Sequence, residues 1–331
     1  MLQENRYENM QYKPCGKHGL KLPRLSLGFW NSFGCMDSRE NMVAVLFEAL
    51  NQGITYFDLA NTYGRPRFGS AEENLGAILS KELAGHRDEI VIATKAGYGF
   101  KEGPYGSGGS RKHLIQNIDG SLKRLGLEYV DIFYSHRFDP EVPLEETACA
   151  LADIVKQGKA LYIGISNYDA EQTRRMSALL NAQGVPCIVH QLRYNLFTRT
   201  AEEGLFDAIT QCGMGAVAFS PLAQGVLTDK YLNGIKEGSR ASVSYSTLKA
   251  KDITPEKIEI VKRLDLIAKS RGESLAQMSL AWVMQHPAVT TVLTGASRPE
   301  QIRENCKVLM AEKFTKEQLF ALENALKYEK I

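Results

Sequence analysis

The chain of 331 residues is long enough for one large α/β barrel or two ordinary domains, and its 44% hydrophobic and 24% charged residues lie close to globular averages. Its 40 basic and 38 acidic residues give a formal net charge of +2, so no global field would attract nucleic acid or an anionic membrane, although a local basic pocket for a phosphate stays open. The six cysteines contain no CxxC pair, which predicts reduced, mostly buried thiols in a cytoplasmic protein. The N-terminal stretch is polar and unlike a signal peptide, and no run of 18 apolar residues exists, so no membrane span is expected.

Regular structure is expected to begin with a hairpin over residues 12–23, where turn glycines separate two short extended segments. Eight short apolar runs then have the character of strands, starting near residues 25, 54, 90, 129, 160, 187, 215 and 289. Helical spacing of apolar residues predicts helices over 38–51, 70–81, 111–125, 144–157, 170–182, 202–211, 255–270, 274–285, 299–310 and 316–328. Gly53 is expected to end the first helix, and Ser70 with Glu73 to form a capping box at the start of the second.

The strands and helices alternate at intervals of roughly 30 residues, except at segment 222–254, which is rich in Gly, Ser and Lys and has no clear period. Strict βα alternation predicts an α/β protein of the (β/α)₈ TIM barrel class. We expect one domain over 1–331, with the hairpin 12–23 capping the barrel, a long loop at 222–254 after the seventh strand and further helices at the C-terminus. A doubly wound open sheet is the rival, but no GxGxxG turn follows the first strand.

Eight residues, all but one of them polar, stand just past the predicted strands, at the end of a barrel where active sites form. They are Asp58, Lys95, His136, Ser166, Asn167, Gln191, Phe219 and Ser220, and Tyr63 stands in the loop after the second strand. Asp58, Lys95 and His136 end consecutive strands, so we expect them side by side at one rim. The alternative is a structural ion pair between Asp58 and Lys95, with His136 as an ordinary rim histidine.

These residue types fit the reduction of an aldehyde or ketone. A free tyrosine has a pKa near 10, and a nearby buried cation lowers it. Lys95 would supply that cation for Tyr63, Asp58 would keep Lys95 charged and directed, and His136 would hydrogen-bond the substrate oxygen. Tyr63 would then act as general acid. The hydride has to come from a cofactor, since no side chain can donate one.

The chain resembles the aldo-keto reductases in a set of motifs that run from end to end in the family's order. These are Asp58 to Gly64 (DLANTYG), Thr94-Lys95, Ser135-His136-Arg137, Gly164-Ile165-Ser166-Asn167, Phe219-Ser220-Pro221-Leu222, and Gly295-Ala296-Ser297-Arg298-Pro299-Glu300-Gln301 with Glu304-Asn305. Within the family, residues 103–111 and 222–231 are most similar to bacterial L-glyceraldehyde 3-phosphate reductases and to potassium-channel β subunits.

The resemblance implies a catalytic tetrad of Asp58, Tyr63, Lys95 and His136, a substrate pocket formed by Trp30, Tyr63 and His136, and no metal. It implies that the loop 222–254 covers a nicotinamide cofactor. The implied cofactor-binding residues are Trp30, Asp58, Ser166, Asn167, Gln191, Phe219, Ser220, Pro221, Leu222, Gln224, Gly225, Lys230, Arg240, Gly295, Ser297, Gln301, Glu304 and Asn305. Without the family, Phe219 and Leu222 would suit a core, Trp30 a packed rim and Ser166-Asn167 a helix N-cap.

Two departures from the family bear on the cofactor and the function. Many members carry Lys-Ser near the position of Gly295-Ala296, and Arg at that of Gln301, to bind the 2′-phosphate of NADPH. Arg298, at a predicted helix start that favours anions, can replace them, so NADPH is expected and NADH is not excluded. The channel β subunits have Asn at the position of His136, so the full tetrad favours an enzyme.

The expected function is therefore NADPH-dependent reduction of small carbonyl compounds, of the L-glyceraldehyde 3-phosphate reductase kind and with methylglyoxal as a further substrate. Arg111, Lys101 or Arg137 would contact a substrate phosphate. The alternative is an NADP(H)-binding, redox-sensing regulatory β subunit with little turnover. A phosphate-binding barrel isomerase is disfavoured, because no Glu ends a predicted strand. The resemblance also implies a homo-oligomer, either a tetramer or an octamer.

Overall fold

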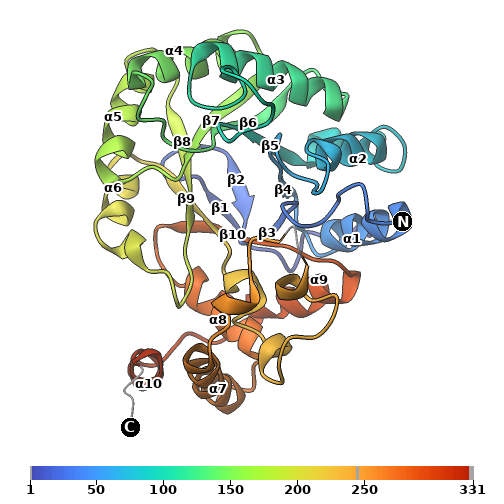
Figure 1. The fold of residues 1–331 in the computed structure, drawn as a ribbon, viewed down its shortest axis with the longest axis vertical. Helices are drawn as coiled ribbons and strands as arrows, with labels where there is room; N and C mark the ends of the chain where they lie inside the picture. The colour runs from blue at the N-terminus through green and yellow to red at the C-terminus, as the bar shows by residue number, and fades with distance from the viewer. Residues whose placement is uncertain (1, 244–245, 328–331) are drawn as a thin grey trace.

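The computed structural model describes residues 2–243 and 246–327, and a closed barrel of eight parallel strands lies at its centre (Figure 1). The ring runs in the order β10-β3-β4-β5-β6-β7-β8-β9, so β10 closes it against β3. This closure confirms the predicted TIM barrel and excludes an open sheet. The strands are β3 (Leu25–Gly28), β4 (Tyr56–Asp58), β5 (Val91–Ala96), β6 (Val130–Ser135), β7 (Ala160–Ser166), β8 (Cys187–Arg193), β9 (Gly215–Phe219) and β10 (Val289–Thr294).

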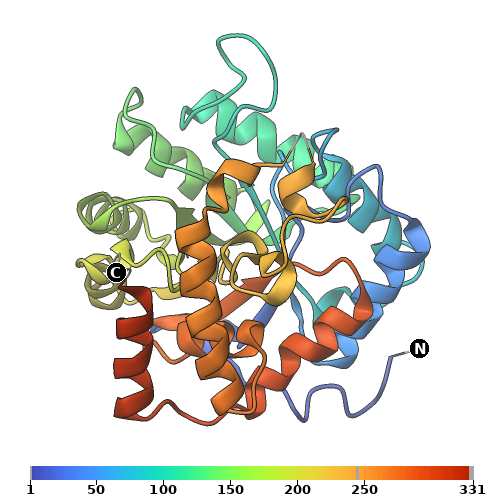
Figure 2. The ribbon, with the colours of Figure 1, turned by 60° about the horizontal axis from the view of Figure 1, so that its bottom comes forward.

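Helices surround the strands, and the C-terminal ones gather along one side of the barrel (Figure 1). In Figure 2 the red helix α10 lies beside the orange helix α7, with which it packs. The helices are α1 (Arg39–Asn51), α2 (Ser70–Leu79), α3 (Arg111–Leu125), α4 (Leu144–Lys156), α5 (Ala170–Asn181), α6 (Leu205–Gln211), α7 (Pro255–Ser270), α8 (Leu275–Met284), α9 (Pro299–Cys306) and α10 (Lys316–Leu326). Within the described residues, none is both long and apolar enough to cross a membrane.

The barrel has two hydrophobic cores, one between strands and helices and a smaller one inside the ring. The inner core includes Tyr56, Ile132 and Tyr134 from the strands. The predicted hairpin is present as β1 (Tyr12–Pro14) and β2 (Lys21–Pro23), and its Cys15 and Leu22 join this inner core. The hairpin therefore packs against the N-terminal ends of the strands, opposite the rim where the predicted site residues lie.

The predicted capping box at Ser70 is wrong. Gly69, with φ of 85°, is the N-cap of α2, and the Ser70 hydroxyl instead donates to the Gly64 carbonyl at 2.6 Å. Glu73 pairs with Arg67 at 2.6 Å rather than with the helix start. A tight turn after Gly64 therefore takes the place of the local cap. The expected role of Gly53 is confirmed, since it follows the end of α1 with φ of 76°.

Several boundaries differ from the prediction. The helix expected over 202–211 divides into a 3₁₀ turn, η2 (Thr200–Glu202), and α6, while that expected over 299–310 divides into α9 and η7 (Lys307–Met310). The helix expected over 316–328 ends at Leu326, and Tyr328 lies outside the described residues, as do residues 244–245 of the long loop. The cysteines are all free, but only Cys15, Cys187 and Cys306 are buried, so the expected burial holds for half of them.

Candidate active site

One cavity of about 810 Å³ opens at the C-terminal ends of the barrel strands. Lys95 does not line it, because this side chain is fully buried behind Tyr63 and Asp58. The other residues predicted for the tetrad, the substrate pocket and the cofactor all do: Trp30, Asp58, Tyr63, His136, Ser166, Asn167, Gln191, Phe219, Ser220, Pro221, Leu222, Gln224, Gly225, Lys230, Arg240, Gly295, Ser297, Gln301, Glu304 and Asn305. Segments as distant in sequence as 30 and 305 therefore meet at one site.

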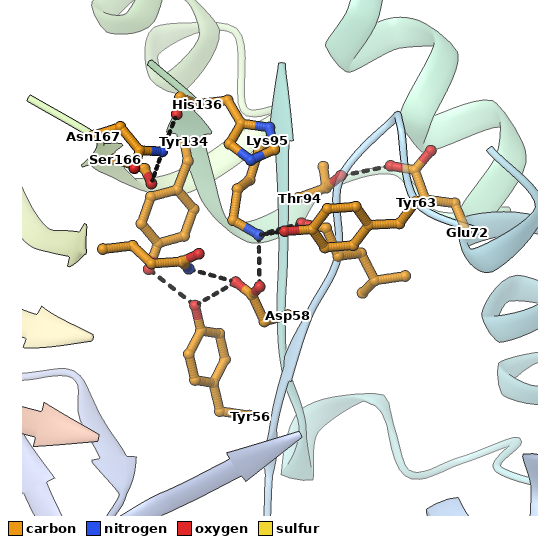
Figure 3. A network of polar contacts seen from close by, with 12 residues as sticks. Tyr56, Asp58, Tyr63, Glu72, Thr94, Lys95, Tyr134, His136, Ser166 and Asn167 are labelled. Carbon is orange, nitrogen blue, oxygen red and sulfur yellow. Dashed lines mark hydrogen bonds and ion pairs between the residues drawn. The ribbon is translucent and has the colours of Figure 1, made fainter. Parts of the chain in front are cut away.

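Lys95 forms the centre of the tetrad (Figure 3). Its ammonium donates to Asp58 Oδ2 at 2.6 Å, to the Leu59 carbonyl at 2.6 Å and to Tyr63 Oη at 3.3 Å. These three acceptors match the three donors of a lysine. Because β4 and β5 are neighbours in the ring, the pair forms directly across two strand ends.

The pKa of Tyr63 is raised well above 10, mainly because burial disfavours the phenolate and secondarily because the Asp58 carboxylate repels it. Our expectation of a lowered pKa is therefore wrong for this site. The Lys95 cation is paired with Asp58, so its charge is largely offset at Tyr63, and burial lowers the pKa of Lys95 itself despite that pairing. Tyr63 consequently holds its proton throughout the neutral range.

His136 lies beside Tyr63, with 6.0 Å between the ring centroids, and its ring contacts Tyr98 edge-on at 4.6 Å. Burial lowers its pKa well below 6.5, and the cations Lys95 and Arg137 lower it further. The imidazole is therefore neutral at pH 7 and carries one N–H. Its buried Nδ1 has no hydrogen-bond partner among the described residues, so His136 is not the satisfied rim histidine of the alternative interpretation.

Asp58 is held from its other oxygen as well. Gln191 Nε2 donates to Asp58 Oδ1 at 2.8 Å, and Tyr56 Oη donates to the same oxygen at 3.1 Å. Tyr56 in turn contacts Tyr134, with 2.9 Å between the two hydroxyls. Figure 3 shows Tyr56 below the Asp58 carboxylate and Tyr134 to its upper left.

The loops after β7 and β9 adopt left-handed backbone at non-glycine residues. Asn167 has φ of 57°, Ser220 of 53° and Gln224 of 61°, and all three line the cavity. Such conformations typically cost about 1–3 kcal/mol each and concentrate at functional sites. The Asn167 amide donates to the His136 carbonyl at 3.0 Å. Helix α5 is capped by Asp169 instead, so Ser166-Asn167 is not its N-cap.

Three cations converge at the far end of the cavity. Burial lowers the pKa of Lys230, and the positive charges of Arg240 and Arg298 lower it further. Burial also lowers the pKa of Arg240. Arg298 is the N-cap residue of α9, and nearby Gln301 accepts from the Ser297 backbone N–H at 2.8 Å. The arrangement favours an anion at this end of the cavity.

The three cations expected to contact a substrate phosphate lie elsewhere. Arg111 pairs with Asp153 on the helix surface at 2.6 Å, Arg137 donates to the Gly97 carbonyl at 3.2 Å, Lys101 is exposed, and none of them lines the cavity. Four residues that were not predicted from the sequence do line the cavity: Arg65, Phe68, Tyr98 and Arg193. Arg65 follows Tyr63 by two residues, which places it in the same loop but does not show which way its side chain points.

Within the described residues, no group of His, Cys, Asp or Glu could hold a metal ion.

The model of the aldo/keto reductase family matches residues 24–327. An L-glyceraldehyde 3-phosphate reductase of Escherichia coli O157:H7 is 51% identical over 318 residues, which is 95% of this chain and 92% of that protein. That of Escherichia coli K12 is 50% identical over 318 residues, again 95% and 92% of the two chains. A probable voltage-gated potassium channel subunit beta of Oryza sativa subsp. japonica is 38% identical over 304 residues, 91% of each chain.

Proposed function

The chain belongs to the aldo/keto reductase family, and from that premise we propose that it is an oxidoreductase that uses NADPH to reduce small aldehydes and ketones. The observation that supports this proposal most is that Lys95 donates hydrogen bonds to both Asp58 and Tyr63. These two residues line a cavity large enough for a dinucleotide. When bound, the nicotinamide supplies the hydride.

Each member of the tetrad has a separate task. Tyr63 donates its phenolic proton to the substrate oxygen as negative charge develops there. Lys95 stabilises the resulting phenolate, and Asp58 fixes Lys95 in place. The neutral His136 donates one hydrogen bond to the same substrate oxygen and so orients the carbonyl. Hydride on the carbonyl carbon and a proton on its oxygen together give the alcohol.

The residues of the cavity fit a dinucleotide. Ser166, Asn167 and Gln191 offer hydrogen-bonding groups for a carboxamide beside the half-buried ring of Phe219. At the other end, the cluster of Lys230, Arg240 and Arg298 suits the phosphates, including the 2′-phosphate that distinguishes NADPH from NADH. Arg298 compensates here for the cations missing at Gly295 and Gln301.

We predict that Arg298→Ala raises the KM for NADPH about tenfold or more and changes the KM for NADH less than about threefold, because an exposed charge that binds one phosphate contributes on the order of 1–2 kcal/mol. Steady-state kinetics with both nucleotides measure the ratio. Lys262→Ala on α7 is the control, because Lys262 pairs with Glu259 and neither residue lines the cavity. Equal effects on both nucleotides would contradict the role of Arg298.

The proposed substrate is L-glyceraldehyde 3-phosphate, the compound that appears in the name of the relative that is 51% identical. Methylglyoxal is proposed as a smaller alternative substrate. Arg65 lines the cavity next to Tyr63 and is the residue that we propose contacts the phosphate. Trp30, Phe68 and Tyr98 provide the apolar walls.

The test is a panel of L- and D-glyceraldehyde 3-phosphate, methylglyoxal and 4-nitrobenzaldehyde with NADPH, followed by nucleotide absorbance. Arg65→Gln should raise the KM for the phosphorylated aldehyde about tenfold and leave that for the uncharged 4-nitrobenzaldehyde nearly unchanged. Loss of activity toward both would assign Arg65 a structural role. No reduction of any member by the wild type would refute the proposed function.

The second candidate function is an NADP(H)-binding regulatory subunit, favoured by the 38% identity to a probable channel β subunit. Tight NADPH binding with no measurable turnover on the panel would support it over an enzyme. The homo-oligomer is a proposal from family resemblance, and the cytoplasmic location is a proposal from the cysteine pattern. Size-exclusion chromatography with light scattering tests the tetramer and octamer.

A further inference from the structure

Two tyrosines below the tetrad have no place in the four-residue mechanism. Tyr56 on β4 and Tyr134 on β6 are both fully buried inside the barrel. Tyr56 Oη lies 3.1 Å from Asp58 Oδ1 and 2.9 Å from Tyr134 Oη. Figure 3 shows the hydroxyl groups of the two phenols pointing toward one another beside the Asp58 carboxylate.

The direction of these hydrogen bonds follows from the available protons. The Asp58 carboxylate, paired with the Lys95 ammonium, can only accept, so the single phenolic proton of Tyr56 goes to Asp58. The oxygen of Tyr56 is then the acceptor in its contact with Tyr134, whose proton must point toward it. The chain therefore runs in one direction, from Tyr134 through Tyr56 to Asp58.

We infer that Tyr134 and Tyr56 are positioning residues, which fix the Asp58 carboxylate and through it the alignment of Lys95 with Tyr63. The kinetic part of this inference rests on the proposed function. Tyr56 and Gln191 both donate to Oδ1, so that Oδ2 faces Lys95. With this plane fixed, the Lys95 ammonium stands between Asp58 and Tyr63. Reaction rates are sensitive to errors of about 1 Å in such alignment.

The barrel provides space for this chain at a specific glycine. Tyr134 pairs in register with Gly164 of β7, and a Cβ built on Gly164 would lie 2.4 Å from Tyr134 Cε1. The absence of a side chain at Gly164 thus lets the Tyr134 ring lie where its hydroxyl reaches Tyr56.

The row of hydrogen bonds from Tyr134 through Tyr56 to Asp58 ends inside the protein. Below it, the inner core is closed by Cys15 and Leu22 of the hairpin, both with no exposed surface. Protons cannot pass from solvent along this path. The two hydroxyls therefore orient Asp58 and do not relay protons.

The test compares Tyr56→Phe, Tyr134→Phe and the double variant with wild type in steady-state kinetics and thermal unfolding. Tyr12→Phe is the matched control, because its hydroxyl donates to the Gly53 carbonyl at 2.7 Å, near the N-terminal ends of the strands. Tyr56→Phe should lower kcat about tenfold or more and change the nucleotide KM less than about twofold. Tyr134→Phe should lower kcat less, because Tyr56 can still donate to Asp58.

The melting temperatures test the direction independently of any activity. Tyr56→Phe leaves the Tyr134 hydroxyl buried without an acceptor, and should lower the melting temperature by about 2–6 °C. The double variant removes that orphaned group, so it should melt no lower than Tyr56→Phe while matching its kcat. If the wild type reduces no carbonyl compound, the proposed function fails, yet this order of melting temperatures still tests the chain.

Two results would overturn the inference. One is a kcat within about twofold of wild type in all three variants, as expected for Tyr12→Phe. The other is a larger loss for Tyr134→Phe than for Tyr56→Phe in both kcat and melting temperature, which would mean that the hydrogen bonds run in the opposite direction.

Discussion

Lys95 is the residue on which the site depends most. Its ammonium has no exposed surface, and an isolated charge in such a place would be strongly destabilising. This cost is offset because the Lys95 ammonium donates three hydrogen bonds, to Asp58, the Leu59 carbonyl and Tyr63. Because burying an ion pair is itself costly, the pair is better explained by chemistry than by stability.

This balance predicts the effect of removing one partner. Asp58→Asn should lower the free energy of unfolding by about 3–5 kcal/mol, because the Lys95 charge stays buried without its counterion. The double variant Asp58→Asn/Lys95→Met should recover much of that loss without recovering activity. Urea denaturation measures both. Asp153→Asn, which breaks the exposed pair with Arg111, is the control and should change the free energy of unfolding by less than about 1 kcal/mol. Equal losses in Asp58→Asn and Asp153→Asn would contradict the account.

The pKa directions of two residues predict a flat pH profile. Tyr63 acts in its protonated form, which persists because its pKa is raised well above 10. His136 acts as the neutral imidazole, which persists because its pKa is lowered well below 6.5. The kcat/KM for an uncharged aldehyde should therefore show no inflection from Tyr63 or His136 between about pH 7 and 9. An inflection in that range that disappears in His136→Gln would show that the histidine titrates there.

At the scale of elements, local patterns predicted the strands well because each is a short, mainly apolar run, and several have a polar residue at or near the end. Asp58 and Lys95 were found by that mark alone. The start of α2 was mispredicted because Ser70 and Glu73 form a local capping pattern, whereas the turn from Gly64 to Gly69 engages Ser70 elsewhere. Only the folded loop could reveal this.

Gly164 provides a test at the same scale. Gly164→Ala should lower the free energy of unfolding by about 1–3 kcal/mol or more, because its Cβ would meet the buried Tyr134 ring at 2.4 Å. Gly19→Ala is the control, since nothing lies within 4 Å of a Cβ there and its φ is not positive. Thermal or urea unfolding measures both variants. A Gly164→Ala protein as stable as Gly19→Ala would mean that the ring shifts freely.

Across the whole molecule, strict βα alternation was enough to predict a closed barrel and hence which residues share a rim. Side chains on loops, such as those of Arg65 and Tyr98, could not be placed in this way, because spacing does not tell which way a loop side chain points. It also passed over Tyr56 and Tyr134, which look like ordinary apolar strand residues until the ring brings their hydroxyls to 2.9 Å.

Buried histidines should make the whole fold sensitive to acid. Burial lowers the pKa of His190 to about 4, against about 6.5 in an unfolded chain, so the unfolded state binds a proton that the folded state does not. The stability is complete above about pH 6.5 and falls as the pH decreases toward 4, by about 2 kcal/mol at pH 5 from His190 alone. Urea midpoints between pH 7 and 5 measure it. His190→Leu should flatten the dependence, and an unchanged slope would contradict the assignment.

The most direct test of the whole account is Tyr63→Phe, which removes one oxygen atom from the proposed proton donor. The test compares the wild type with the variant in two measurements: NADPH binding by fluorescence, and NADPH oxidation with L-glyceraldehyde 3-phosphate. The account predicts dissociation constants within about twofold and a loss of turnover on the order of 10²–10⁴-fold, the usual contribution of a general acid. Turnover in Tyr63→Phe close to that of the wild type would contradict it.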